Sequence, residues 1–84
     1  MEIIEIYFDK IRGHATLKES STFHSVWRID VQDKFIVIRE NFEREPKYEL
    51  VEHSADVDIE KVKEQIPIIM WQIDQFKVQQ RPKP

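Results

Sequence analysis

The side chains in this sequence that could bind a metal are few, and their spacing fits no known ligand pattern. His14, His24 and His53 stand at least ten positions apart. Zinc sites draw three or four ligands from short recurring spacings, such as two histidines four residues apart on one helix. The chain contains no cysteine, so thiolate sites and disulfides are excluded. We therefore predict no metal site and no cofactor.

A nucleophilic active site is equally unsupported. Ser20, Ser21 and Ser25 lie close to His24 in the sequence, but a nucleophile also needs an oxyanion donor, often backbone amides at a turn that contains glycine. Gly13 is the only glycine in the chain, which also excludes a glycine-rich phosphate loop. Serines in such a cluster are typical of turns. We predict that the protein is not an enzyme.

One set of residues suggests contact with nucleic acid instead. On the outward side of a predicted hairpin, basic side chains and an aromatic ring share one face, an arrangement that stacks single-stranded bases on sheets. The net charge of −3 opposes this reading, because attraction to phosphates dominates such affinity. Nucleic-acid binding is therefore the alternative function. Its candidate residues are His24, Arg28, Phe35 and Arg39.

The charges are unevenly distributed along the chain. Residues 43–60 hold seven acidic and two basic residues, whereas residues 61–84 hold five basic and two acidic ones. Acids that precede a helix and bases that follow it complement the helix dipole. The alternative is an acidic surface that meets a basic partner. The residues of that candidate acidic surface are Glu43, Glu45, Glu49, Glu52, Asp56 and Asp58.

The clearest structural element is a helix in the last third of the chain. Apolar residues recur there at steps of three and four, which places them on one stripe. Asp56 or Asp58 is the expected N-cap, and the helix is expected to run to about Gln80. Pro67 lies inside it and predicts a kink or a break. The stripe consists of Ile59, Val62, Ile66, Ile69, Met70, Ile73 and Phe76.

A second group of apolar residues lies off that stripe. Exposed tryptophans with aliphatic neighbours are typical interface anchors, so we predict that this group binds a protein partner or a second copy. Two alternatives would make Trp71 part of the core: the kink rotates the second half of the helix, or an N-terminal helix packs on it. The predicted partner-binding residues are Trp71, Ile68, Val78 and Pro67.

The N-terminal segment fits two patterns. As a helix over residues 2–12, it has acids in its first turn, bases in its last turn and Gly13 at the C′ position. As a strand, Ile4, Ile6 and Phe8 alternate with Glu5. We favour the helix because it accounts for more residues, including the glycine.

The middle of the chain predicts strands. Residues 22–31 alternate between apolar and polar side chains, and residues 35–39 form a second apolar run. With a two-residue loop at Gln32 and Asp33, four apolar side chains point inward. The loop lacks glycine, so a shifted register stays open. The pairs that this loop predicts are Ile29 with Ile36 and Trp27 with Ile38.

Two further strands are expected on either side of this hairpin. Residues 14–19 suggest a short edge strand, and residues 48–52 form a strand with Tyr48 and Leu50 inward, after a surface loop over residues 41–47. The sequence thus predicts an α+β fold: an N-terminal helix, a three- to four-stranded antiparallel sheet, and a long C-terminal helix packed on one face of the sheet.

Length and composition predict a single domain over residues 1–80 with a flexible tail over residues 81–84. A domain this small buries only about 60 to 65% of its unfolded surface, so a partner or a dimer would supplement its stability. No apolar run is long enough to cross a bilayer, and no basic leader is visible. We expect a cytoplasmic, non-enzymatic interaction module, dimeric or bound to a larger protein as a regulator or inhibitor.

Overall fold

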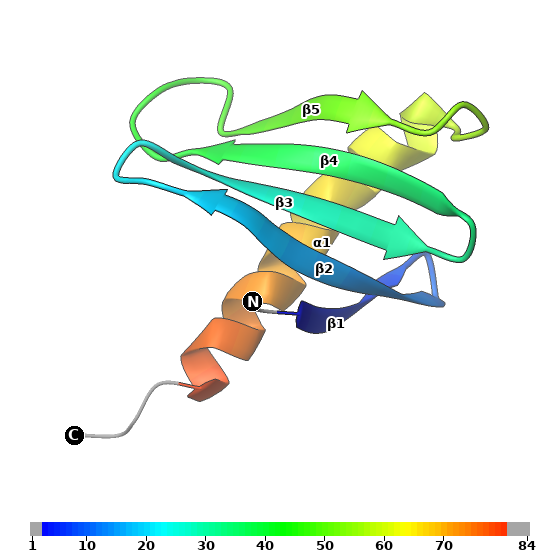
Figure 1. Cartoon of the computed structure of the whole chain (residues 1–84), viewed down its shortest axis with the longest axis horizontal. Coiled ribbons are helices and arrows are strands. Elements are labelled where there is room, and N and C mark those ends of the chain that lie inside the picture. Colours follow the sequence, from blue (N-terminus) through cyan, green and yellow to red (C-terminus); the bar gives the residue numbers. More distant parts are fainter. Residues whose placement is uncertain (1–2, 81–84) are drawn as a thin grey trace.

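The structure is a computed structural model that describes residues 3–80. Five antiparallel strands follow one another in sheet order β1-β2-β3-β4-β5, and one helix then crosses behind the sheet (Figure 1). The predicted tail over residues 81–84 lies outside the described residues. The elements are β1 Ile3–Phe8, β2 Ile11–Ser20, β3 His24–Val31, β4 Lys34–Asn41, β5 Tyr48–His53 and α1 Ile59–Gln80.

The predicted N-terminal helix is wrong, and so is the count of three to four strands. Residues 3–8 form β1, an edge strand whose Ile4 and Ile6 are buried against α1 while Ile3 and Tyr7 are exposed. The alternation of apolar residues and the β-branched isoleucines therefore outweigh the helix-like ends. Asp9 and Lys10 adopt positive φ angles of 48° and 72°, which makes the tight turn to β2 without a glycine.

Gly13 serves close packing within the sheet, not the end of a helix. It lies in β2 opposite Ile6. A Cβ at this position would come within 2.6 Å of the Asp30 carbonyl oxygen and 2.7 Å of Val31 Cγ2. Any other residue would therefore push β3 away, so glycine is required for strand spacing.

The predicted β3–β4 hairpin is confirmed, including its register. Ile29 pairs with Ile36 and Trp27 with Ile38, and all four side chains are buried. Gln32 supplies the positive φ of 57° that the tight turn requires.

Of the two strands predicted on either side of the hairpin, one differs from the prediction and one agrees with it. The strand expected over residues 14–19 is longer and lies inside the sheet, because β1 covers the edge on which it was placed. The strand after residue 47 is confirmed as β5, with Tyr48 and Leu50 packed against the core. Residues 42–47 form the exposed loop between β4 and β5, although Asn41 itself is buried.

The core lies between one face of the sheet and one stripe of α1, as the helix periodicity predicts. Val62, Ile66, Ile69, Met70 and Ile73 are at most 5% exposed. The opposite face of the sheet, called the outer face below, is not covered by any other element of residues 3–80 (Figure 1). The long C-terminal helix packed on one face of the sheet is thus confirmed.

The ends and the middle of α1 follow simple backbone rules. Asp58 is the N-cap, since its Oδ1 accepts hydrogen bonds from the amides of Glu60 at 3.1 Å and Lys61 at 3.3 Å. The helix continues through Pro67 without the predicted break. Pro67 is exposed, so water can reach the carbonyl whose hydrogen bond the proline removes.

Candidate interaction surface

The solvent-facing side of α1 presents an apolar centre. Trp71 is 61% exposed and Ile68 is 48% exposed, and Pro67 is exposed beside them. These three predicted partner-binding residues therefore lie together on one surface, while the side chain of the fourth, Val78, lies outside the described residues. We call this surface the exposed flank. Its residues are Glu60, Lys63, Glu64, Pro67, Ile68, Trp71, Asp74 and Gln75.

Two glutamines fix α1 against the edge of the sheet and so set the direction of the exposed flank. The Tyr7 amide donates to Gln72 Oε1 at 2.7 Å, and Gln72 Nε2 donates to the Tyr7 carbonyl at 2.8 Å. The Asp9 amide donates to Gln65 Oε1 at 3.0 Å. The helix therefore cannot roll about its axis without breaking backbone contacts to β1 and the turn after it.

The same contacts close part of the β1 edge to a partner strand. An edge strand offers unpaired backbone groups to any extended segment, but at Tyr7 both groups are already bonded to Gln72. Lys61 Nζ also lies 3.0 Å from the Asp9 carboxylate. This hydrogen bond raises the pKa of Lys61. A partner strand therefore cannot pair with the backbone of Tyr7 unless Gln72 moves.

Sequence reasoning missed Gln65 and Gln72 because neither has an apolar side chain. Their spacing of seven places them on one side of a helix, at the border between the buried stripe and the exposed flank. That spacing suggests a shared contact, but Tyr7 and Gln72 are 65 positions apart, and no local pattern identifies β1 as the target.

The charged residues of the exposed flank have no ion partner in the part of the chain that the structure describes. Lys63, Glu64 and Asp74 are all exposed, and none takes part in the salt bridges found among residues 3–80. The flank therefore combines an apolar centre with unpaired charges on both sides along the helix.

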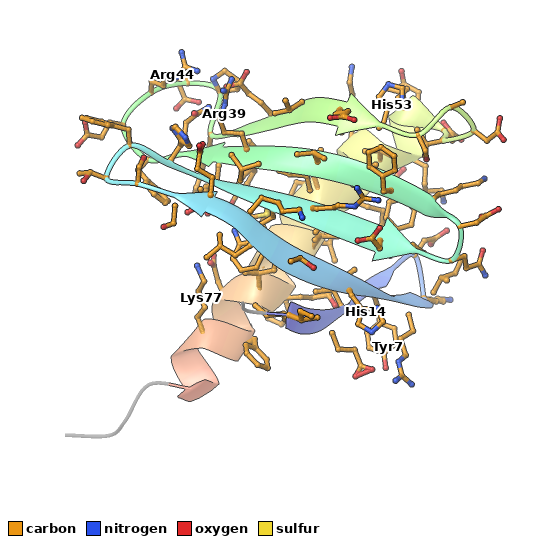
Figure 2. The ribbon with its side chains drawn as sticks, viewed as in Figure 1. Tyr7, His14, Arg39, Arg44, His53 and Lys77 are labelled. Carbon is orange, nitrogen blue, oxygen red and sulfur yellow. The ribbon has the colours of Figure 1, made fainter. Side chains whose placement is uncertain are left out.

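The outer face of the sheet, which faces the viewer in Figure 2, holds the alternative nucleic-acid residues, and each basic residue among them has an acidic neighbour. Arg28 Nε donates to Asp30 at 3.1 Å, and its guanidinium lies 4.2 Å from the centre of the Phe35 ring. Arg39 donates to Glu49 at 3.2 Å. His24 Nε2 lies 2.6 Å from the Glu19 carboxylate. The four residues do share this face, but their charge is neutralised locally, which weakens attraction for phosphates.

Glu49 is the centre of the charge network on this face. Its carboxylate accepts hydrogen bonds from Asn41 Nδ2 at 2.6 Å and from Arg39 and Arg44, the two arginines labelled at the upper left of Figure 2. The bond from Asn41, helped by the two arginines, lowers the pKa of Glu49. The Asn41 amide also donates to the Pro46 carbonyl at 2.8 Å, so the network fixes the loop between β4 and β5.

The structure does not gather the candidate acidic surface into one patch. The loop before β5 and the loop after it lie at opposite ends of that strand (Figure 1). Glu49 is neutralised by arginines, and Asp58 caps α1. Glu43 and Glu45 belong to the first loop, Glu52 lies on β5, and Asp56 belongs to the second loop.

A carboxyl group is buried at the end of the core that lies near the last turns of α1. Glu40 is only 8% exposed, on the same side of β4 as Ile36 and Ile38. Burial, and then the nearby charge of Asp74, raises the pKa of Glu40. Lys77 lies close by, with its Nζ 5.1 Å from the centre of the Trp27 ring. Sequence reasoning missed Glu40. Its place two residues after Ile38 on the same strand could have indicated an inward position, but no local pattern identifies its neighbours on α1.

A small apolar cavity of about 190 Å³ opens between the start of α1 and the sheet. Cavities of similar size in other proteins accept a benzene ring. Its polar neighbours are Gln32, Lys34, Asp58 and Lys61, of which Asp58 already caps the helix and Lys61 pairs with Asp9. We assign it no ligand. Its apolar lining is Phe8, Ile11, Ile29, Val31, Phe35, Ile36, Val57 and Val62.

Other kinds of site find no support over residues 3–80. No group of three or more histidine, aspartate or glutamate side chains is placed to hold a metal ion within this range. Nor does any helix in it have the length and apolarity needed to cross a bilayer. Comparison with protein-family models, with curated proteins and with solved structures finds no match for this chain.

Proposed function

We propose that this chain is a small non-enzymatic protein-interaction module whose contact surface is the exposed flank of α1. The observation that carries the proposal is Trp71, 61% exposed on a rigid helix with Ile68 and Pro67 beside it. Large aromatic side chains with aliphatic neighbours dominate the binding energy of protein interfaces. A domain of this size gains stability when such a surface is covered.

The chemistry of the flank favours a protein over a nucleic acid. Three of its four charged residues are acidic, namely Glu60, Glu64 and Asp74, so phosphates would be repelled. The paired cations of the outer face also argue against nucleic acid at the sheet. We therefore carry the protein-binding function forward and not the alternative.

The test compares Trp71→Ala with Phe23→Ala. Phe23 is a matched control because it is 65% exposed and lies in the turn between β2 and β3, away from the flank. Urea unfolding at low protein concentration should give the same stability for both variants and the wild type. Association, whether with a second copy or with a protein retained on an affinity column, should be lost only with Trp71→Ala.

Two results would overturn the proposal. If Trp71→Ala unfolds at much lower urea, the tryptophan is part of the core. If association is unchanged by Trp71→Ala, the flank is not the contact surface. A role as a regulator or inhibitor of a larger protein, and a cytoplasmic location, belong to the same proposal. Mass spectrometry of proteins lost specifically with Trp71→Ala tests the first, and cell fractionation tests the second.

A further inference from the structure

The charges of the exposed flank are arranged in two rows on either side of Trp71. At 100° per residue, Lys63 and Asp74 fall on one side of the tryptophan, and Glu64 and Gln75 fall on the other. Pro67 and Trp71 occupy the strip between these rows, and Ile68 lies just beyond the row of Glu64 and Gln75. Each row thus holds one polar residue toward the start of α1 and a complementary one toward its end.

These residues are also balanced along the axis of α1. The midpoints between complementary residues fall within one position of Ile69, so the flank has one common centre. Residues 63 and 74 are eleven positions apart, about 16 Å along a helix, which is too far for a salt bridge within one chain. The complementary residues are Lys63 with Asp74, Pro67 with Trp71, and Glu64 with Gln75.

We propose that the partner of the exposed flank is a second copy of this chain, with the two α1 helices antiparallel about a two-fold axis near Ile69; this inference rests on the proposed function. In a two-fold dimer the same patch serves both copies and must complement itself. An antiparallel copy sets Lys63 of each chain against Asp74 of the other, and Glu64 against Gln75. Trp71 then packs on the apolar strip near Pro67.

A parallel pair differs from this arrangement in a testable way. Its two-fold axis would run along the helices and set each row against the opposite row, so Lys63 would face Glu64 and Asp74 would face Gln75. In that pair the exchange of both charges would not restore affinity, because residue 63 would then be an acid facing Glu64. Strand addition at β1 is hindered because Gln72 already binds both backbone groups of Tyr7. A single helix flank is at the small end of specific interfaces, so we expect a dissociation constant of about micromolar.

Charge exchange tests the antiparallel contact directly. Lys63→Asp places an acid against Asp74 of the other copy, and Asp74→Lys places a base against Lys63. Because two attractive pairs become repulsive in each case, each single variant should weaken the dimer by about tenfold or more. The double variant Lys63→Asp/Asp74→Lys restores opposite charges and should recover most of the affinity. Sedimentation equilibrium over a concentration series measures all four proteins.

Matched controls separate this contact from general charge effects. Lys18→Asp and Glu43→Lys make the same kinds of change at exposed positions away from α1, and neither should change the dissociation constant. Circular dichroism and urea unfolding verify that each variant is folded. In wild type labelled with 5-fluorotryptophan, the Trp71 resonance should shift with concentration, whereas that of the buried Trp27 should not.

The outcomes distinguish this inference from the proposed function. A wild type that stays monomeric at the highest concentration overturns the second copy; loss of a captured protein with Trp71→Ala would then leave the proposed function intact. A dimer that the double variant does not restore overturns the antiparallel arrangement. If Trp71→Ala affects neither self-association nor capture, both proposals fail.

Discussion

The outer face of the sheet and the exposed flank of α1 are both open to solvent, but they differ in whether their charged residues are paired within the chain. On the outer face Arg28, Arg39 and His24 each lie beside an acid of the same chain. On the flank, Lys63 and Asp74 have no ion partner within the described residues. A surface with internally paired charges gains little from a partner, whereas the flank carries charges that a partner can complement.

The two regions also differ in their apolar content. The Phe35 ring of the outer face is partly covered by the Arg28 guanidinium, but Trp71 stands at the centre of the flank with most of its surface in water. Exposed apolar area with a polar border is a common mark of protein contact sites. The comparison therefore locates the interaction on the helix and not on the larger surface of the sheet.

The largest effect should come from two adjacent isoleucines that separate the flank from the core. Ile69 is fully buried and Ile68 is 48% exposed. Ile69→Ala should lower the free energy of unfolding by about 3 kcal/mol, whereas Ile68→Ala should change it by less than about 0.5 kcal/mol and weaken association instead. Urea unfolding and sedimentation measure the two properties. Equal losses of stability would mean that the flank is not a distinct surface.

A smaller loss is expected where α1 meets the edge strand. Gln72→Ala removes two hydrogen bonds to the Tyr7 backbone, which should cost about 1 to 2 kcal/mol of unfolding free energy. The Tyr7 amide should also exchange faster with deuterium. Gln75→Ala is the matched control at a protein concentration low enough for the monomer, because Gln75 is exposed on the flank and makes no contact with β1 among the hydrogen bonds of residues 3–80. If both variants unfold alike, the glutamine contact does not hold the helix in place.

The pH dependence of stability probes the paired charges of the outer face. The pKa of Glu49 is lowered from its ordinary value near 4.5, first by its bond from Asn41. A carboxyl whose pKa is lower in the folded state stabilises above its ordinary pKa, and this contribution is lost as the pH falls through the lowered value. Glu49→Gln should therefore melt a few degrees lower than wild type at pH 7, with the two curves converging in acid.

The control for this pH experiment lies on the same strand. Glu52 is exposed and forms no ion pair among residues 3–80, so Glu52→Gln should follow the wild-type curve throughout. Parallel curves for Glu49→Gln and wild type, with no convergence at low pH, would contradict a stabilising role for the Glu49 network.

Much of the fold follows from periodicity, and the main error arose where two periods coincide. The stripe around Ile69 and the pairing of Trp27 with Ile38 were predicted because each element satisfies only one repeat. Residues 3–8 fit both a helical and an alternating pattern, and Gly13 resembled a helix terminator. Its true constraint, the approach of β3 within 2.6 Å of a Cβ, depends on a strand that is distant in sequence.

The candidate site was predictable to a similar degree. Helical phase alone places Trp71, Ile68 and Pro67 off the buried stripe, and the structure exposes all three. What the sequence could not provide is the contact of Gln72 with Tyr7 or the pairing of Arg39 with Glu49 on the outer face. These depend on which strands become neighbours, and the neighbour that matters most is β1, the element that was predicted as a helix.

Added salt should have the smallest effect of these changes, and it tests whether the charges of the exposed flank, unlike those of the outer face, contact a second copy. The screening length falls from about 8 Å at physiological ionic strength to about 3 Å at 1 M. Wild-type association should weaken only a few-fold on added salt, because Trp71 and its apolar neighbours supply most of the binding. The penalty of Lys63→Asp should shrink in the same titration, since it arises from exposed like charges. If high salt leaves that penalty unchanged, Lys63 acts through packing and not through Asp74 of the other copy.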